Sequence, residues 1–134
     1  MLVIRNDHPL VDEKLTLEKI ASNPIVTYMT GYVDRNLIVQ TFKEAGLGLD
    51  ISCSAGDTEV IKTYVRLNLG VGIMAQMART EEADDDLVFR DVGHLFKDST
   101  TRVVYSEDCK IRKYMEYFIK LLYEYGQTFG KQLV

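Results

Sequence analysis

The stretch from residue 49 to residue 77 constrains the fold of this chain most, because it has the pattern strand, helix, strand. Residues 49–54 are predicted to form a strand, Asp57 is a suitable N-cap for a helix that extends to Asn68, and residues 70–74 are predicted to form a buried strand. Strands that alternate with helices over short loops run parallel in a sheet that helices cover. This stretch therefore predicts an α/β fold.

The segments on either side continue the alternation. Before residue 49, the patterns predict a strand at 2–4, a short helix that Thr16 caps and Pro24 ends, a strand at 25–28 and a helix at 34–45. After residue 77, they predict strands at 87–91 and 102–105 and a long terminal helix at 110–133. This alternation favours parallel pairing in a sheet that helices cover.

Two further patterns lie in the second half of the chain. An acidic run at residues 81–86 is predicted to be a solvated turn rather than a cation site, because its neighbours supply no second set of ligands. The terminal helix has an apolar stripe that is predicted to pack in the core. Its members are Ile111, Met115, Phe118, Leu122 and Tyr125.

The composition excludes several classes of function. With 46% hydrophobic and 27% charged residues, the chain has the composition of a folded soluble protein. Its 16 Lys and Arg residues against 20 Asp and Glu residues predict no direct contact with DNA, which normally requires a basic face. No apolar stretch approaches the roughly 20 residues that cross a bilayer, and the mixed charges of residues 1–7 lead us to expect no export signal. Cys53 and Cys109 lack C-x-x-C spacing, so we expect reduced thiols, a core position for Cys53 and a cytoplasmic protein.

Three motifs suggest catalysis or cofactor binding, but the residues and elements around each motif do not match those that the function requires. Gly70-Val-Gly-Ile-Met-Ala matches the glycine pattern of dinucleotide sites, but it follows a helix and opens a strand, so a tight turn is predicted. Ser54 is placed like a hydrolase nucleophile, but Ser52 replaces the first glycine of that motif. Neither His8 nor His94 is placed as a base, and the two lack metal-ligand spacing. No enzyme activity, metal or other cofactor is therefore predicted.

Small hydroxyl-bearing residues and a glycine gather where predicted strands end and helices begin. They are Thr27, Tyr28 and Thr30 before the helix that opens near Asp34, and Ser52, Ser54, Gly56 and Thr58 around the helix that opens at Asp57. Free backbone N–H groups make such places suitable for a sulfate, phosphate or carboxylate. The alternative is that these residues only cap the helices. Asp34 and Asp57 would repel an anion and would have to point away from it.

Several segments also form a pattern that is specific to one protein family. They are Asp7-His-Pro-Leu, residues 17–28, Phe42-Lys-Glu-Ala-Gly-Leu and residues 57–75, of which 26–28 and 60–67 are the most specific. In these segments the chain resembles the effector-binding domain of LysR-type transcriptional regulators, most closely the CysB and Cbl subgroup. Ser99-Thr-Thr-Arg and the terminal helix extend the resemblance over nearly the whole chain.

The resemblance implies an α/β fold of the periplasmic-binding-protein-like type II, in which an effector is held between two lobes. Residues 26–101 would form lobe II, residues 1–25 a remnant of lobe I, and residues 102–134 the return to lobe I with the C-terminal helix. The opening part of lobe I and a helix-turn-helix domain would precede residue 1. The chain is therefore expected to be a truncated portion of a longer protein that reaches DNA only through that missing domain. It is also expected to form a homodimer or a higher oligomer.

The resemblance further implies an effector from sulfur assimilation, either an acetylserine, sulfate or thiosulfate, or adenosine phosphosulfate. By position, Thr27 matches a ligand-contacting threonine, and Ser54 and Asp57 keep the chemistry of a second contact segment, while Gly56 replaces a hydroxyl residue. The predicted site comprises Thr27, Tyr28, Thr30, Ser54, Gly56, Asp57 and Thr58. The alternative function is a truncated fragment that no longer binds ligand and acts through dimerisation.

Overall fold

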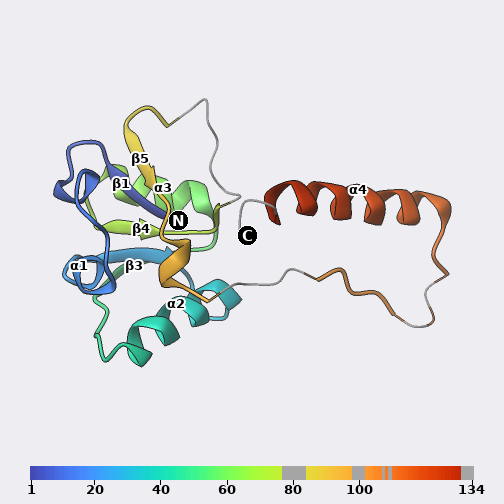
Figure 1. Cartoon of the computed structure of the whole chain (residues 1–134), viewed down its shortest axis with the longest axis horizontal. Coiled ribbons are helices and arrows are strands. Elements are labelled where there is room, and N and C mark those ends of the chain that lie inside the picture. The colour runs from blue at the N-terminus through green and yellow to red at the C-terminus, as the bar shows by residue number, and fades with distance from the viewer. Residues whose placement is uncertain (77–83, 98–101, 107, 109, 131–134) are drawn as a thin grey trace. The chain divides into compact units, whose positions relative to one another are not determined.

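The computed structural model describes residues 1–76, 84–97, 102–106, 108 and 110–130, and for residues 127–130 the backbone alone. The chain divides into two compact units, Met1–Ser99 and Thr100–Val134. The first unit contains a sheet with helices on both faces, and the second contains one long helix (Figure 1).

The first unit is built on a five-stranded sheet in the order β3-β2-β4-β1-β5. The strands are β1 (Leu2–Arg5), β2 (Ile25–Tyr28), β3 (Ile51–Ala55), β4 (Val71–Ile73) and β5 (Leu87–Arg90). The predicted parallel pairing is confirmed for β2 with β3 and with β4. It is wrong for β1, which is antiparallel to β4 and β5. β1 pairs with strands that are distant in the sequence, and no crossover helix dictates the direction of such pairs.

The position of β1 bears on the predicted lobes. Because β1 lies between β4 and β5, residues of the predicted lobe I remnant, 1–25, share one sheet with residues of the predicted lobe II, 26–101. The assignment of these segments and of residues 102–134 to two lobes of a larger protein stays a prediction.

Two apolar layers enclose the sheet. One layer contains α1 (Leu17–Ala21), α2 (Val33–Glu44), and the short 3-10 turns η1 (Pro9–Val11) and η3 (Gly93–Leu95), and the other contains α3 (Thr58–Arg66). The predicted N-caps of α1 and α3 are confirmed. Thr16 Oγ1 accepts a hydrogen bond from the Lys19 N–H at 3.4 Å, and Asp57 Oδ1 accepts one from the Val60 N–H at 2.9 Å.

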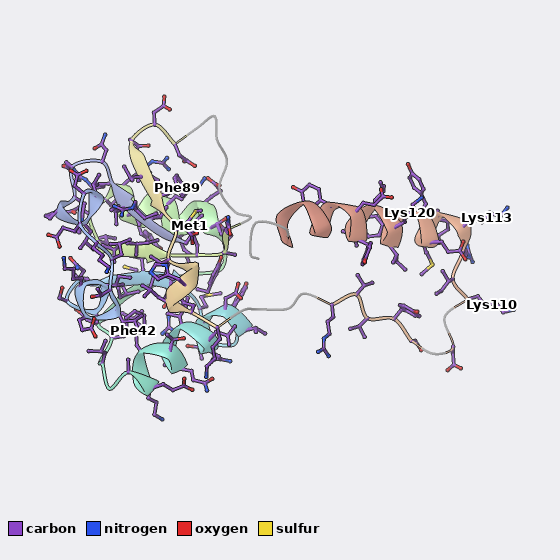
Figure 2. All side chains as sticks on the ribbon, in the orientation of Figure 1. Met1, Phe42, Phe89, Lys110, Lys113 and Lys120 are labelled. Carbon is purple, nitrogen blue, oxygen red and sulfur yellow. The ribbon has the colours of Figure 1, made fainter. Side chains whose placement is uncertain are left out.

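Alternate residues of the central strands face the two layers. In β1, Leu2 and Ile4 pack in the α1–α2 layer, whereas Val3 packs against α3. Phe42, which Figure 2 labels, is fully buried in the α1–α2 layer, and burial of such a side chain contributes about 1.5–3 kcal/mol. Cys53 is partly buried against the α3 layer, and Cys109 lies outside the described residues.

The glycines between α3 and β4 form the predicted turn with close packing. Gly70 has a φ of +152°, and a Cβ at this position would lie only 2.3 Å from Pro24 O. At Gly72, within β4, a Cβ would lie 2.8 Å from Val3 Cγ1 and 3.0 Å from Val65 Cγ2. The absence of a side chain at Gly72 therefore allows α3 to lie directly on the sheet.

A group of charged residues joins α3 to the segment that precedes β5. The Nζ atom of Lys62 lies 2.8 Å from Asp84 Oδ2 and 2.7 Å from Glu59 Oε1. Arg66 pairs with Asp84 at 2.6 Å and with Asp86 at 2.7 Å. Lys62 is only 1% exposed and Asp84 only 7%, so the centre of this ion-pair network is buried.

The network corrects the prediction that residues 81–86 form a solvated turn. That prediction is wrong for Asp84, and residues 81–83 lie outside the described residues. Burial alone would raise the pKa of Asp84, but the hydrogen bonds and charges of Lys62 and Arg66 together lower it below its ordinary value. Burial alone would lower the pKa of Lys62, and its bonds to Asp84 and Glu59 raise it instead. Both groups are therefore charged at neutral pH.

The second unit contains α4 (Lys113–Gly130), from which Lys113 and Lys120 project in Figure 2. The predicted strand at 102–105 is wrong, because the described residues give this segment no partner strand. The prediction of a buried apolar stripe is also wrong within the described residues, since Phe118 and Tyr125 are 59% and 64% exposed. No helix in the described ranges is both long and apolar enough to span a membrane.

Replacement of Asp84 by Asn should destabilise the first unit by about 3 kcal/mol, because it removes a charge partner of the buried Lys62. Glu59 still contacts Lys62, so we expect the lower end of the range for broken buried pairs. Denaturant unfolding followed by circular dichroism measures the change. The control is Asp85→Asn at the exposed neighbour, which should cost less than about 0.5 kcal/mol. Equal effects of the two variants would contradict the network's role.

Acid should remove the same stabilisation. The pKa of Asp84 is lower in the folded state than in the unfolded state, so its contribution is complete above the unfolded value of about 3.9 and is lost as the pH falls through the folded value. Denaturant unfolding at a series of pH values should show the stability of the wild type decreasing from about pH 4 towards pH 2. The Asp84→Asn variant should show a shallower decrease, and an identical slope would contradict this prediction.

Candidate functional site

The predicted site residues gather at the edge of the sheet where β2 and β3 end. Thr27 lies in register with Ser54, and Tyr28 with Ala55, so the carboxyl ends of these parallel strands lie side by side. α2 begins shortly after β2, and α3 begins shortly after β3. This edge, from Thr27 to the start of α2 and from Ser54 to the start of α3, is called the β2–β3 edge below.

Thr27 and Tyr28 use their hydroxyl groups to hold the end of β4. Thr27 is completely buried, and its Oγ1 donates a hydrogen bond to Ile73 O at 2.9 Å. The Tyr28 hydroxyl accepts one from the Ala75 N–H at 2.9 Å, and burial raises the pKa of this hydroxyl. Both residues therefore form the base of the β2–β3 edge. Contact of either with a ligand stays a prediction.

Tyr32, the N-cap residue of α2, connects the two halves of the edge. Its ring stacks on Tyr28 with centroids 5.8 Å apart, and its hydroxyl donates to Gly56 O at 3.0 Å. A Cβ at Gly56 would lie 3.3 Å from Met29 Cε and 3.8 Å from the Tyr32 hydroxyl. The absence of a side chain at Gly56 thus leaves the space that Met29 and Tyr32 occupy.

The other predicted residues lie at the surface of the same edge. Ser54 and Thr30 are exposed, and Thr58, which is half-buried, is the first residue of α3. The carboxylate of Asp57 is turned to the first turn of its own helix, which confirms its N-cap role, while contact of Gly56 or Asp57 with a ligand stays a prediction. A role for Thr30, Ser54 and Thr58 in ligand contact stays a prediction.

Arg35, which the sequence patterns did not single out, supplies a positive charge at this edge. It lies in the first turn of α2, and its Nη1 donates to Tyr28 O at 2.9 Å and to Ser54 Oγ at 3.2 Å. A cation is unfavourable in the first turn of a helix because the dipole is positive there. An arginine at that position therefore indicates a role other than helix stability, and this signal was present in the sequence.

These groups suit binding rather than catalysis. The β2–β3 edge offers hydroxyl groups, a guanidinium and the N–H groups of two helix starts, which are groups that can donate hydrogen bonds to an anion. Neither histidine lies there: His8 Nδ1 accepts a hydrogen bond from the Leu10 N–H at the start of η1, and His94 lies in η3.

The comparisons with known proteins decide the family. The model of the LysR substrate-binding domain matches residues 1–127. The chain belongs to this family.

Relatives and a solved structure agree with this assignment. The chain is 43% identical over 121 residues to the HTH-type transcriptional regulator SsuR of Burkholderia cenocepacia, covering 90% of this chain and 39% of SsuR. It is 42% identical over 133 residues to the HTH-type transcriptional regulator CysB of the same organism, covering 98% of this chain and 42% of CysB. The crystal structure of the cofactor-binding domain of the Cbl transcriptional regulator is similar with a TM-score of 0.67 and 44% identity, covering 71% of this chain and 42% of that structure.

The chain therefore spans about two-fifths of the length of these relatives. The resemblance to the CysB and Cbl subgroup is confirmed, and so is the α/β fold of the periplasmic-binding-protein-like type II. The relatives are transcriptional regulators rather than enzymes.

Replacement of Thr27 by Val should lower the free energy of unfolding by about 1 kcal/mol, because the shape is kept and the hydrogen bond to Ile73 O is lost. The matched control is Thr30→Val, which removes an exposed hydroxyl nearby and should change stability by less than about 0.5 kcal/mol. Urea unfolding at equilibrium measures both variants. Unchanged stability of Thr27→Val would show that this hydroxyl is not needed to hold β4.

Proposed function

We propose that this chain is the effector-sensing part of a CysB-like LysR-type transcriptional regulator and that it binds a small anionic metabolite at the β2–β3 edge. The observation that carries this proposal is the meeting of Ser54, the Arg35 guanidinium and the starts of α2 and α3 at one edge of the sheet. In open α/β sheets, ligands bind at the carboxyl ends of the strands. The protein acts by binding, and the ligand is not chemically changed.

The donors at this edge favour an anion. The first N–H groups of a helix have no carbonyl partner within the helix, and in α2 no side chain caps them, whereas in α3 Asp57 caps one. The start of a helix also carries partial positive charge. The resemblance to the CysB and Cbl subgroup adds the class of metabolite, from sulfur assimilation. We propose an acetylserine, sulfate or thiosulfate, or adenosine phosphosulfate as the effector.

In the longer protein, effector binding would affect the contact with DNA. We propose that residues 26–101 belong to lobe II, that residues 1–25 and 102–134 belong with lobe I, and that the effector lies between the lobes and biases their closure. A helix-turn-helix domain outside this chain would contact DNA. The regulator would act in the cytoplasm as a homodimer or a higher oligomer.

The exposed apolar residues of α4 favour the alternative of an interaction fragment. The side chains of Phe118, Leu121 and Leu122 are each at least 40% exposed within the second unit. Exposed apolar faces of this kind mark contact surfaces. In this alternative the chain associates with itself and binds no effector.

A thermal-shift experiment with the full 134-residue chain tests the proposal. The ligands are sulfate, thiosulfate, O-acetylserine, N-acetylserine and adenosine phosphosulfate. At one hundred times its dissociation constant, a ligand that binds only the folded state adds about 2.7 kcal/mol and raises the melting temperature. We expect at least one ligand to do so, and Ser54→Ala to weaken its binding because a hydrogen bond to a charged ligand contributes about 1.5–3 kcal/mol.

Sulfate stabilises proteins in general, so the variants supply the control. Ser22→Ala removes an exposed hydroxyl from the same unit and should leave every ligand shift as in the wild type. No shift with any ligand, together with self-association in sedimentation, would favour the interaction fragment. A shift that Ser54→Ala leaves unchanged would place the ligand elsewhere.

A further inference from the structure

The charge of Arg35 has no carboxylate partner among the described residues. In the same unit, Arg5 pairs with Asp7 at 2.6 Å, and Arg66 pairs with two carboxylates. Arg35 instead bonds two uncharged oxygens, those of the Tyr28 carbonyl and the Ser54 hydroxyl. Its positive charge is therefore available to an external anion.

The hydrogen bonds also leave one edge of the guanidinium available. Both are donated by Nη1, and within the described part of the chain Nε and Nη2 of Arg35 make no hydrogen bond. Two N–H groups of a guanidinium form a planar fork that matches two oxygens of a carboxylate, sulfate or phosphate. Since Nη1 is fixed to the ends of β2 and β3, the fork is held in place before a ligand arrives, which reduces the entropy cost of binding.

A depression of about 750 Å³ opens beside this arginine. Its lining includes Arg35, Thr30, Asn36, Gln40 and Lys43, which carry hydrogen-bond donors. Two of them are cations, so an anion that enters meets favourable charge on α2 itself.

The carboxylates of Glu44 and Asp57 are compensated or turned away, whereas that of Asp34 is not. Glu44 also lines it, but its carboxylate lies 2.8 Å from Lys97 Nζ and accepts a hydrogen bond from Gln40, which together lower its pKa. Asp57 is turned to the first turn of α3. Asp34, beside Arg35 in the first turn of α2, is the opposing charge that remains, and it disfavours ligands of high negative charge.

We propose that Arg35 is the residue that pairs with the charge of the effector, and that its Nε–Nη2 edge receives an oxyanion from this depression. The inference rests on the proposed function and deepens it, because it names the group that selects the ligand and the feature selected, which is an oxyanion with two oxygens in one plane. Ser54 then acts together with Arg35 by holding Nη1.

Calorimetric titration of the full chain with sulfate, with N-acetylserine and with the uncharged amide of N-acetylserine tests this inference. Arg35→Gln should weaken the binding of sulfate and N-acetylserine at least tenfold, and Arg35→Lys should restore part of the loss. The wild type should prefer N-acetylserine to its amide, and Arg35→Gln should lose that preference, which a merely structural role would not produce. The control Lys14→Gln removes one charge from an exposed lysine of the same unit and should bind as the wild type does.

The outcomes distinguish a failure of the role of Arg35 from a failure of the proposed function. Equal affinities of the wild type and Arg35→Gln for the anions would overturn the role of Arg35 and leave the proposed function standing. No binding of any anion by the wild type would overturn both. Should Arg35→Gln fail to fold, the Arg35 Nε–H resonance of the wild type gives the answer: a shift on titration with sulfate supports the contact, and an unmoved resonance overturns it.

Discussion

Two side-chain hydrogen bonds, from Thr27 to Ile73 and from Ala75 to Tyr28, hold the carboxyl ends of β2 and β4 together. The backbone pairing of these strands runs only from Ile25 to Val26 on the β2 side, so the side chains continue the connection beyond the point where the ladder ends. Tyr32 and Arg35 both contact Tyr28 at this end, so their positions depend on it. Residues that the sequence marks as ligand contacts are thus also structural members of the edge.

The sequence determines the local elements well because each has a local cause. Thr16 and Asp57 cap helices through bonds that span three residues, and Gly70 turns the chain where any side chain would meet Pro24 O. The direction of β1 has no local cause, because it depends on pairing with β4 and β5, which lie far from β1 in the sequence. The buried position of Asp84 is equally hidden, because it follows from Lys62, which looks like a solvent-facing lysine of an amphipathic helix.

The same distinction explains what the sequence shows of the candidate site. Hydroxyl residues at strand ends are visible as a pattern, and the structure brings Thr27, Tyr28 and Ser54 to one edge. For Arg35 the sequence shows the unusual position in the first turn of a helix, but not the reach to Tyr28 O and Ser54, which depends on how α2 packs against the sheet. The apolar stripe of α4 illustrates the opposite error, since periodicity shows that a face is apolar and does not show what covers it.

The packing at Gly72 has a mechanical consequence. Ile61 and Val65 of α3 pack against β4 where a side chain at residue 72 would otherwise lie, and the charged residues of α3 anchor it further to the segment before β5. In α2 only Ile38 and Phe42 are buried, and its first turn is held by the side chains of Tyr32 and Arg35. In a moving molecule, α3 would therefore behave as the fixed frame of the unit, and displacement on binding would appear in α3 last.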